Sequence, residues 1–194
     1  MTGKKKKLLL FLIVPLFLSC KGTPPTNDLN SPMGLFCYDY IAGSWDTEEK
    51  EDCTASSSQI KIGFYAYNPE PGFTGYNIYI IKGGTPTYED FQAIVNSRIN
   101  NGSFTTGGDN YIISGGISFT PPQDNYYPTL PGYNYPEVKI KVIKIETLIE
   151  YEPTFSGPNP VAISSGVYYI GVTSLDKTNV VESKISNIIK VTVP

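Results

Sequence analysis

The chain contains no histidine, and its 194 residues include only one tryptophan, two methionines and three cysteines. Without an imidazole base, a serine, threonine or cysteine nucleophile loses its commonest activator. Arg98 is the single arginine, and the formal net charge is −3. A nucleic-acid partner requires lysine and arginine to neutralise its phosphates, so the composition predicts no nucleic-acid binding.

Long hydrophobic runs are scarce. The clearest one, Leu8 to Leu18, directly follows four lysines, Lys4 to Lys7. A membrane-spanning helix needs about 20 apolar residues, so this run is too short for a permanent anchor. A basic start followed by an apolar core of about 7–15 residues is typical of a secretory signal. Two other interpretations of residues 1–20 stay open. One is an ordinary cleaved signal in which Cys20 has no role, and the other is a buried N-terminal helix.

The end of this segment, Phe17-Leu18-Ser19-Cys20, resembles the lipobox of bacterial lipoproteins, which are cut before a cysteine that receives lipid. The resemblance implies that residues 1–19 are a signal peptide and that lipid on Cys20 holds the protein to a membrane. Lys21 stands where an aspartate often marks inner-membrane retention, which implies the outer membrane or cell surface. Residues 20–32 are polar and rich in proline, and they predict a flexible tether.

Cys37 and Cys53 are the cysteines that remain. Export places them in an oxidising compartment, so we expect them to form a disulfide. A loop of about 17 residues would then stabilise the fold by roughly 3 kcal/mol. The alternative is a metal site, but two cysteines without histidine make half a zinc site at best, and we predict no metal and no cofactor.

Period-2 alternation of apolar residues indicates several half-buried strands. Four of them have a single buried phase, and their apolar residues are Ile60, Ile62 and Phe64; Tyr76, Ile78 and Ile80; Tyr168, Ile170 and Val172; and Ile189, Val191 and Val193. In a fifth, Val138, Ile140 and Val142 alternate before the phase slips to Ile143 and Ile145. The slip predicts a bulge or a strand that is covered on both faces.

One segment has the helical period. Thr87 and Asp90 are spaced as a capping box with aspartate in place of glutamate, and Asn101-Gly102 is a stop signal. Phe91, Ile94, Val95 and Arg98 share one face, so a helix over 87–100 should cover a sheet.

The strand segments resemble a fibronectin type III domain. Residues 59–80 are similar to its second and third strands, with Phe64 in place of the family's tryptophan, residues 166–175 to its sixth and residues 182–193 to its last. The resemblance implies a mainly β, antiparallel β-sandwich over residues 33–194. A domain of about 100 residues is too short for the interval between these blocks. We therefore expect an insertion at about 83–160 with one α-helix and long loops, although a different Greek-key sandwich remains open.

No catalytic constellation is visible. Paired carboxylates could serve a glycan hydrolase, and Glu150 and Glu152 share a strand face. Glu48, Glu49, Glu51 and Asp52 form an acidic cluster that is either a solvated face or a Ca²⁺ site. The glycine pairs lack the lysine and the strand–loop–helix setting of a phosphate loop.

The strongest binding candidate is the segment 120–136, which contains five prolines and the tyrosines Tyr126, Tyr127, Tyr133 and Tyr135. Tyrosine gives a protein-binding loop a large contact area at low entropic cost, and flat rings also suit glycans. The alternative is an insertion whose rings fold back on the sandwich.

The sequence thus favours a non-enzymatic, lipid-anchored binding or adhesion module with a protein or glycan ligand. A structural accessory subunit of an envelope assembly is the first alternative, and a histidine-free carboxylate hydrolase acting on glycans is the second.

Overall fold

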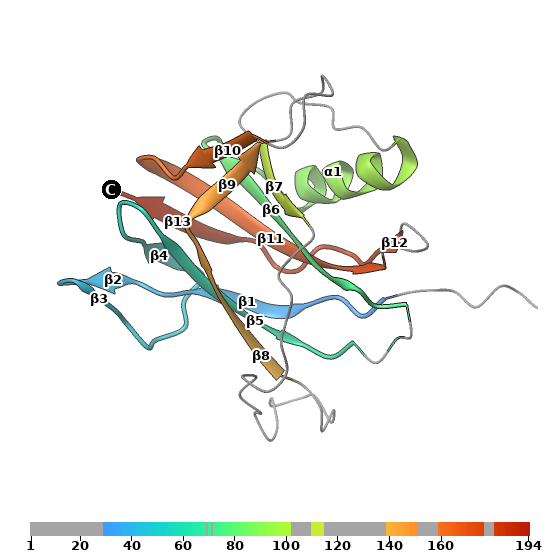
Figure 1. The fold of residues 1–194 in the computed structure, drawn as a ribbon, viewed down its shortest axis with the longest axis horizontal. Helices are drawn as coiled ribbons and strands as arrows, with labels where there is room; N and C mark the ends of the chain where they lie inside the picture. The colour runs from blue at the N-terminus through green and yellow to red at the C-terminus, as the bar shows by residue number, and fades with distance from the viewer. Residues whose placement is uncertain are drawn as a thin grey trace, which may run out of the picture.

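The computed structural model describes residues 29–68, 70, 72–101, 110–114, 139–150, 159–176 and 181–194. Within these residues the protein is mainly β with one helix (Figure 1), as the sequence predicts. The elements are β1 (Met33–Cys37), β2 (Tyr40–Ile41), β3 (Ser44–Trp45), β4 (Asp52–Thr54), β5 (Ile60–Ala66), β6 (Gly75–Lys82), α1 (Tyr88–Asn101), β7 (Asn110–Ser114), β8 (Lys139–Ile145), β9 (Thr147–Glu150), β10 (Asn159–Ala162), β11 (Gly166–Asp176), β12 (Val181–Glu182) and β13 (Ile189–Val193).

Two mostly antiparallel sheets make up the sandwich. The smaller sheet has the order β1-β5-β8, and the larger has the order β10-β9-β7-β6-β11-β13-β4, with β12 paired to β11. Among the described pairs, β13 and β4 alone run parallel. β2 and β3 pair with each other as a separate hairpin.

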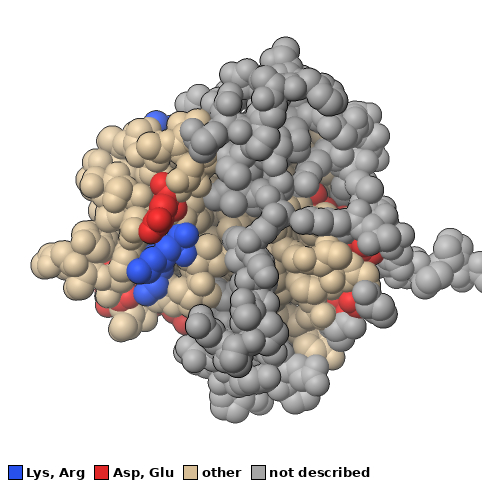
Figure 2. Space-filling model, viewed as in Figure 1, with Lys and Arg blue, Asp and Glu red and all other residues tan. Residues whose placement is uncertain are grey.

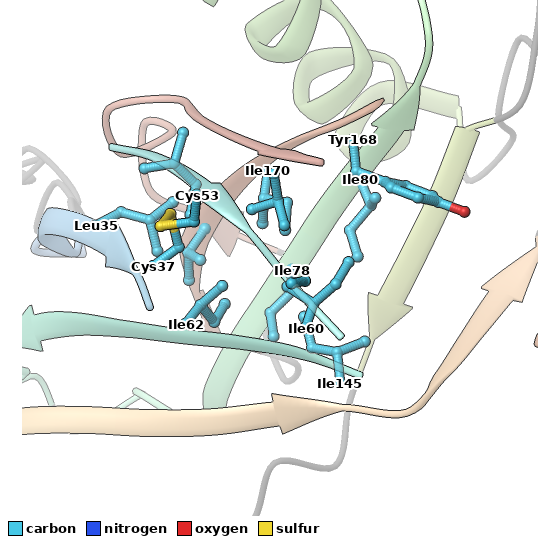
Figure 3. Packing of buried hydrophobic residues seen from close by; sticks show 14 of the residues in the cluster. Leu35, Cys37, Cys53, Ile60, Ile62, Ile78, Ile80, Ile145, Tyr168 and Ile170 are labelled. Carbon is cyan, nitrogen blue, oxygen red and sulfur yellow. A yellow bond between two sulfur atoms is a disulfide. The ribbon is translucent and has the colours of Figure 1, made fainter. Parts of the chain in front are cut away.

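The inner faces of the sheets carry the alternating residues that the sequence predicts. Ile60, Ile62 and Phe64 of β5 are 0% exposed. Their counterparts on the larger sheet are at most 3% exposed, namely Tyr76, Ile78, Ile80, Tyr168, Ile170, Val172, Ile189, Val191 and Val193. Together they form one core cluster (Figure 3). Burial of each large apolar side chain stabilises the fold by about 1.5–3 kcal/mol, so this shared core holds the sheets together.

A disulfide joins the two sheets along one side. Cys37 ends β1 and Cys53 lies in β4, and their Cα atoms are 6.1 Å apart. β1 belongs to the smaller sheet and β4 is an edge strand of the larger one. This bond confirms the predicted pairing of Cys37 with Cys53. Both cysteines lie in the core cluster (Figure 3). The bond closes the loop 38–52, which contains β2 and β3.

Asn187 links the same two sheets through hydrogen bonds. Its Oδ1 accepts from the Leu35 N–H at 2.7 Å, and its Nδ2 donates to the Leu35 carbonyl at 2.8 Å. The amide therefore takes the place of a neighbouring strand for β1. The adjacent Ser186 Oγ accepts from the Val172 N–H at 3.0 Å, which fixes this corner to β11.

On the other side of the sandwich, two consecutive strands connect the smaller sheet to the larger one. β8 pairs with β5 from Ile145 to Lys139, and beyond Glu146 the chain enters β9 of the larger sheet. The predicted bulge or double-sided cover of this strand is wrong. The β5–β8 register has no shift, and Val142 is 47% exposed, because Ile145 and the partly buried Ile143 occupy the inward phase.

α1 covers part of the outer face of the larger sheet. Its capping box forms as predicted, because Asp90 Oδ2 accepts from the Thr87 N–H at 2.8 Å and the Asp90 N–H donates to Thr87 Oγ1 at 3.3 Å. Phe91 and Val95 are 0% exposed and pack in a cluster with Tyr79 of β6.

The first described residues are packed against the domain. Leu29 is 7% exposed. The Asn30 N–H donates to Glu70 Oε1 at 2.6 Å, and the Asn30 carbonyl accepts from Ser174 Oγ at 2.6 Å. The packed domain therefore begins inside the segment 20–32 that the sequence assigns to a tether.

The disulfide should be a major source of stability. We expect the Cys37→Ala/Cys53→Ala double variant to lose about 3 kcal/mol of free energy of unfolding, because opening the loop increases the entropy of the unfolded chain. Urea denaturation of the full chain measures this loss. A Cys20→Ser variant keeps the disulfide and is the control, and equal stability of all three proteins would contradict the prediction.

Asn187→Ala should lower the free energy of unfolding by about 1–3 kcal/mol, because it leaves the Leu35 N–H and carbonyl without this partner. Asn96→Ala is the matched control, since Asn96 is an exposed residue of α1. Its effect should stay within about 0.5 kcal/mol. Losses of the same size in both variants would show that the amide is not an inter-sheet link.

Candidate functional site

Several residues singled out by the sequence lie outside the described part of the chain. They are Cys20, the side chain of Glu150, Glu152, and the tyrosines Tyr126, Tyr127, Tyr133 and Tyr135. The described residues include the loop 38–52 that the disulfide closes. It combines exposed aromatic and apolar residues with the whole acidic cluster Glu48, Glu49, Glu51 and Asp52.

β2 and β3 form a short hairpin at one end of the molecule (Figure 1). The two residues of its turn, Ala42 and Gly43, have φ values of 49° and 89°. Two positive φ angles characterise the type I′ turn, whose twist matches that of paired strands. A two-residue turn leaves little freedom between the strands, so the hairpin holds its side chains in fixed positions.

The hairpin presents apolar side chains to solvent. Tyr40 is 36% exposed and Ile41 is 56% exposed, the highest fraction among the large hydrophobic residues described. Trp45, the single tryptophan, is partly buried against the core. The Tyr40 ring packs on Trp45 with ring centroids 5.1 Å apart and an interplanar angle of 62°. We call Tyr40, Ile41 and Trp45 the hairpin tip.

Lys50 occupies the centre of neighbouring carboxylates. Its Nζ lies 2.8 Å from Asp39 Oδ2, 3.0 Å from Glu48 Oε2 and 3.8 Å from Asp46 Oδ2. Hydrogen bonds to Asp39 and then Glu48 raise the pKa of Lys50 above its ordinary value. The Lys50 ammonium group therefore occupies the position among these carboxylates where a bound metal cation would lie. In the described part of the chain, no group of three or more acids or cysteines is arranged to hold a metal ion.

Two of these carboxylates, together with Asp52, are also open to solvent. The side chains of Glu48 and Asp52 are 70% and 65% exposed, and Asp46 is 32% exposed. Asp52 is paired with Lys190 at 2.9 Å. We call Asp46, Glu48 and Asp52 the acidic rim.

Asp39 fastens the base of the hairpin to the sandwich. Its Oδ2 accepts from Lys50, and its Oδ1 accepts from the Thr54 N–H of β4 at 2.6 Å. These two bonds, with the Lys50 bond the larger, hold the pKa of Asp39 below its ordinary value of 3.8. The ionised carboxylate is therefore the form that the fold stabilises.

The outer face of the smaller sheet is aromatic and basic. Lys61 Nζ lies 4.2 Å from the centre of the Tyr38 ring, and Lys61 pairs in register with Lys144. Burial, followed by repulsion from Lys144, lowers the pKa of Lys61. The exposed Val142 belongs to the same sheet. Figure 2 shows basic side chains gathered on this view of the molecule with acidic ones on both sides.

Comparison with protein families, curated proteins and solved structures gives no match for this chain. In the portion of the chain that the structure describes, the single helix is neither long nor apolar enough to span a bilayer.

The sequence interpretation overlooked the hairpin. Its signal is present in Tyr40-Ile41-Ala42-Gly43-Ser44-Trp45, where apolar residues flank a turn that contains glycine. β2 and β3 have only two residues each, which is too short for an alternation of apolar and polar residues to be recognised. The segment also matches the fibronectin type III pattern poorly. Besides the local turn, the bonds of Asp39 and the disulfide, which join it to distant residues, hold its conformation.

Asp39→Asn should flatten the loss of stability in acid. Because folding lowers the pKa of Asp39, its ionised form stabilises the protein above the unfolded pKa of about 3.9, and this contribution disappears as the pH falls through the folded pKa. Urea unfolding at about pH 5, 4 and 3 should therefore show a steeper decline for the wild type than for the variant.

Glu89→Gln is the control, because Glu89 is an exposed acid on α1. It should decline as steeply as the wild type. If the unfolding free energies of wild type and Asp39→Asn fall equally with pH, the ionised Asp39 carboxylate does not stabilise the base of the hairpin.

Proposed function

We propose that this protein is a non-enzymatic binding module, exported and lipid-anchored through Cys20 at the bacterial outer membrane or cell surface. The observation that carries the proposal is the lipobox-like sequence Phe17-Leu18-Ser19-Cys20 behind a basic and then apolar segment. Acyl chains each contribute about 0.8 kcal/mol per buried CH₂, and more than one chain makes the anchoring stable.

The disulfide supports export. Structural disulfides persist in oxidising compartments and are rare in a reducing cytosol. The bond between Cys37 and Cys53 also engages two of the three cysteines. Cys20 is then the cysteine left for acylation.

The strand order supports the fibronectin type III likeness. In immunoglobulin-type sandwiches the third, sixth and seventh strands are neighbours in one sheet and the second lies in the other. The segments assigned to those positions from the sequence are β6, β11 and β13, which are neighbours, and β5, which lies in the opposite sheet. Domains of this architecture serve many functions, so the binding role rests on surfaces and not on the fold.

The ligand that we propose is a protein or a glycan. Removal of residues 1–19 takes away four lysines and changes the net charge from −3 to −7, which opposes nucleic-acid binding. The segment 120–136, with Tyr126, Tyr127, Tyr133 and Tyr135, remains one proposed contact surface, because it combines tyrosine area with proline stiffness. The proposed interaction uses no cofactor and no metal.

Cys20→Ser should release the protein from the membrane fraction, because the variant lacks the thiol that receives lipid. Metabolic labelling with an alkyne fatty acid, followed by membrane fractionation and mass spectrometry of the amino terminus, measures the change. Wild type should be labelled and membrane-bound.

Ser19→Ala is the matched control, since it keeps a small residue before the cysteine and should remain labelled. An unprocessed amino terminus, or a Cys20→Ser protein that stays on the membrane, would falsify the proposal.

A further inference from the structure

The position of the hairpin relative to the proposed anchor is fixed by β1. Asn30 is bonded to Glu70 and Ser174 at one end of the sandwich, and β1 starts there with Met33 opposite Tyr65. β1 then leads away from this end to Cys37, directly before the hairpin. Figure 1 shows β2 and β3 at the end of the molecule toward which β1 runs.

The lipid on Cys20 would therefore hold the Leu29 end near the bilayer. Leu29 is nine positions after Cys20, and nine steps of about 3.3 Å span roughly 30 Å at most. A domain attached in this way keeps its Asn30 end toward the membrane. The hairpin, at the other end, becomes the membrane-distal part of the described structure.

The hairpin tip has the properties of an anchor in a protein interface. Ile41 and Tyr40 are two of the four large hydrophobic residues that the described structure exposes, and they are adjacent. The disulfide, the type I′ turn and the Asp39 bonds fix their positions before any partner binds. Such preorganisation lowers the entropic cost of association.

Charge determines the kind of partner. Segment 39–52 contains six acids against one lysine, and Asp46 of the acidic rim directly follows Trp45 of the hairpin tip. An anionic lipid surface would repel this rim. A glycan would need an open ring face, whereas Ile41 offers no ring and the Tyr40 ring packs against Trp45.

We propose that the hairpin tip is a docking element that inserts Ile41 and Tyr40 into an apolar pocket of another envelope protein, a pocket bordered by lysine and arginine that pair with the acidic rim. This inference rests on the proposed function, because acylation at Cys20 defines the membrane-distal end. Apolar anchors surrounded by a charged rim are the usual arrangement of a protein interface.

Site-specific photocrosslinking in the cells that make this protein tests the inference. The probe is benzoylphenylalanine, placed in the full-length chain at Tyr40 or, as a matched control, at Tyr88. Both tyrosines have similar exposure, 36% and 40%, but Tyr88 lies on α1. The cross-linked species are separated by mass and identified by peptide mass spectrometry.

We expect a discrete adduct with one other protein from position 40 and none from position 88. Ile41→Ser should reduce its yield by about tenfold, the effect typical of an interface anchor. Val142→Ser, which removes another exposed aliphatic side chain, should leave the yield unchanged. Glu48→Lys should also reduce it, whereas Glu89→Lys, on the helix, should not.

Support requires in addition that the cross-linked peptide of the partner lies in an apolar pocket with lysine or arginine at its border. An adduct with a second copy of this chain, an adduct with phospholipid, equal adducts from both positions, or no adduct from position 40 would each overturn the proposal. Labelling of Cys20 is measured in the same cells. A specific adduct without acylation would refute the anchor alone, and acylation without the adduct would refute the docking element alone.

Discussion

The buried bond between Cys37 and Cys53 is the constraint on which the candidate site depends. It joins β1 of the smaller sheet to β4 at the edge of the larger one, so it holds the two layers of the core together at that side. The same bond closes the loop that carries the hairpin tip and Lys50. The bond therefore contributes both to the stability of the core and to the conformation of the candidate site.

Hydrogen bonds reinforce this side of the sandwich with different chemistry. Asn187 completes the edge of β1, and Asp39 joins the hairpin to β4 through the Thr54 N–H. On the opposite side the chain itself links the two sheets, because it passes from β8 to β9 through Glu146.

The hairpin presents exposed apolar side chains from a loop that the disulfide closes, and the binding role that we propose uses this combination. Lys50 brings one positive charge to the three carboxylates of Asp39, Asp46 and Glu48, so it stabilises the loop and leaves a net negative charge. Ile41 is the most exposed large hydrophobic residue described, and the adjacent Tyr40 packs on the partly buried Trp45. In the docking that we propose, a partner would cover both side chains. The acidic rim would then select among partners, since opposite charge speeds association and like charge prevents it.

Several local elements are predictable from short stretches of the chain. Alternation in β5, β6, β11 and β13 predicted their inward faces, and the Thr87–Asp90 spacing predicted the start of α1, because both signals arise within a few residues. The packing of the two sheets sets which phase of β8 faces the core, which residue Asn187 bonds, and that Lys50 lies among the acids of its loop. These features depend on contacts between distant segments, such as Leu35 and Asn187, which are 152 residues apart. No local period encodes such a contact; it exists only after the two sheets have packed.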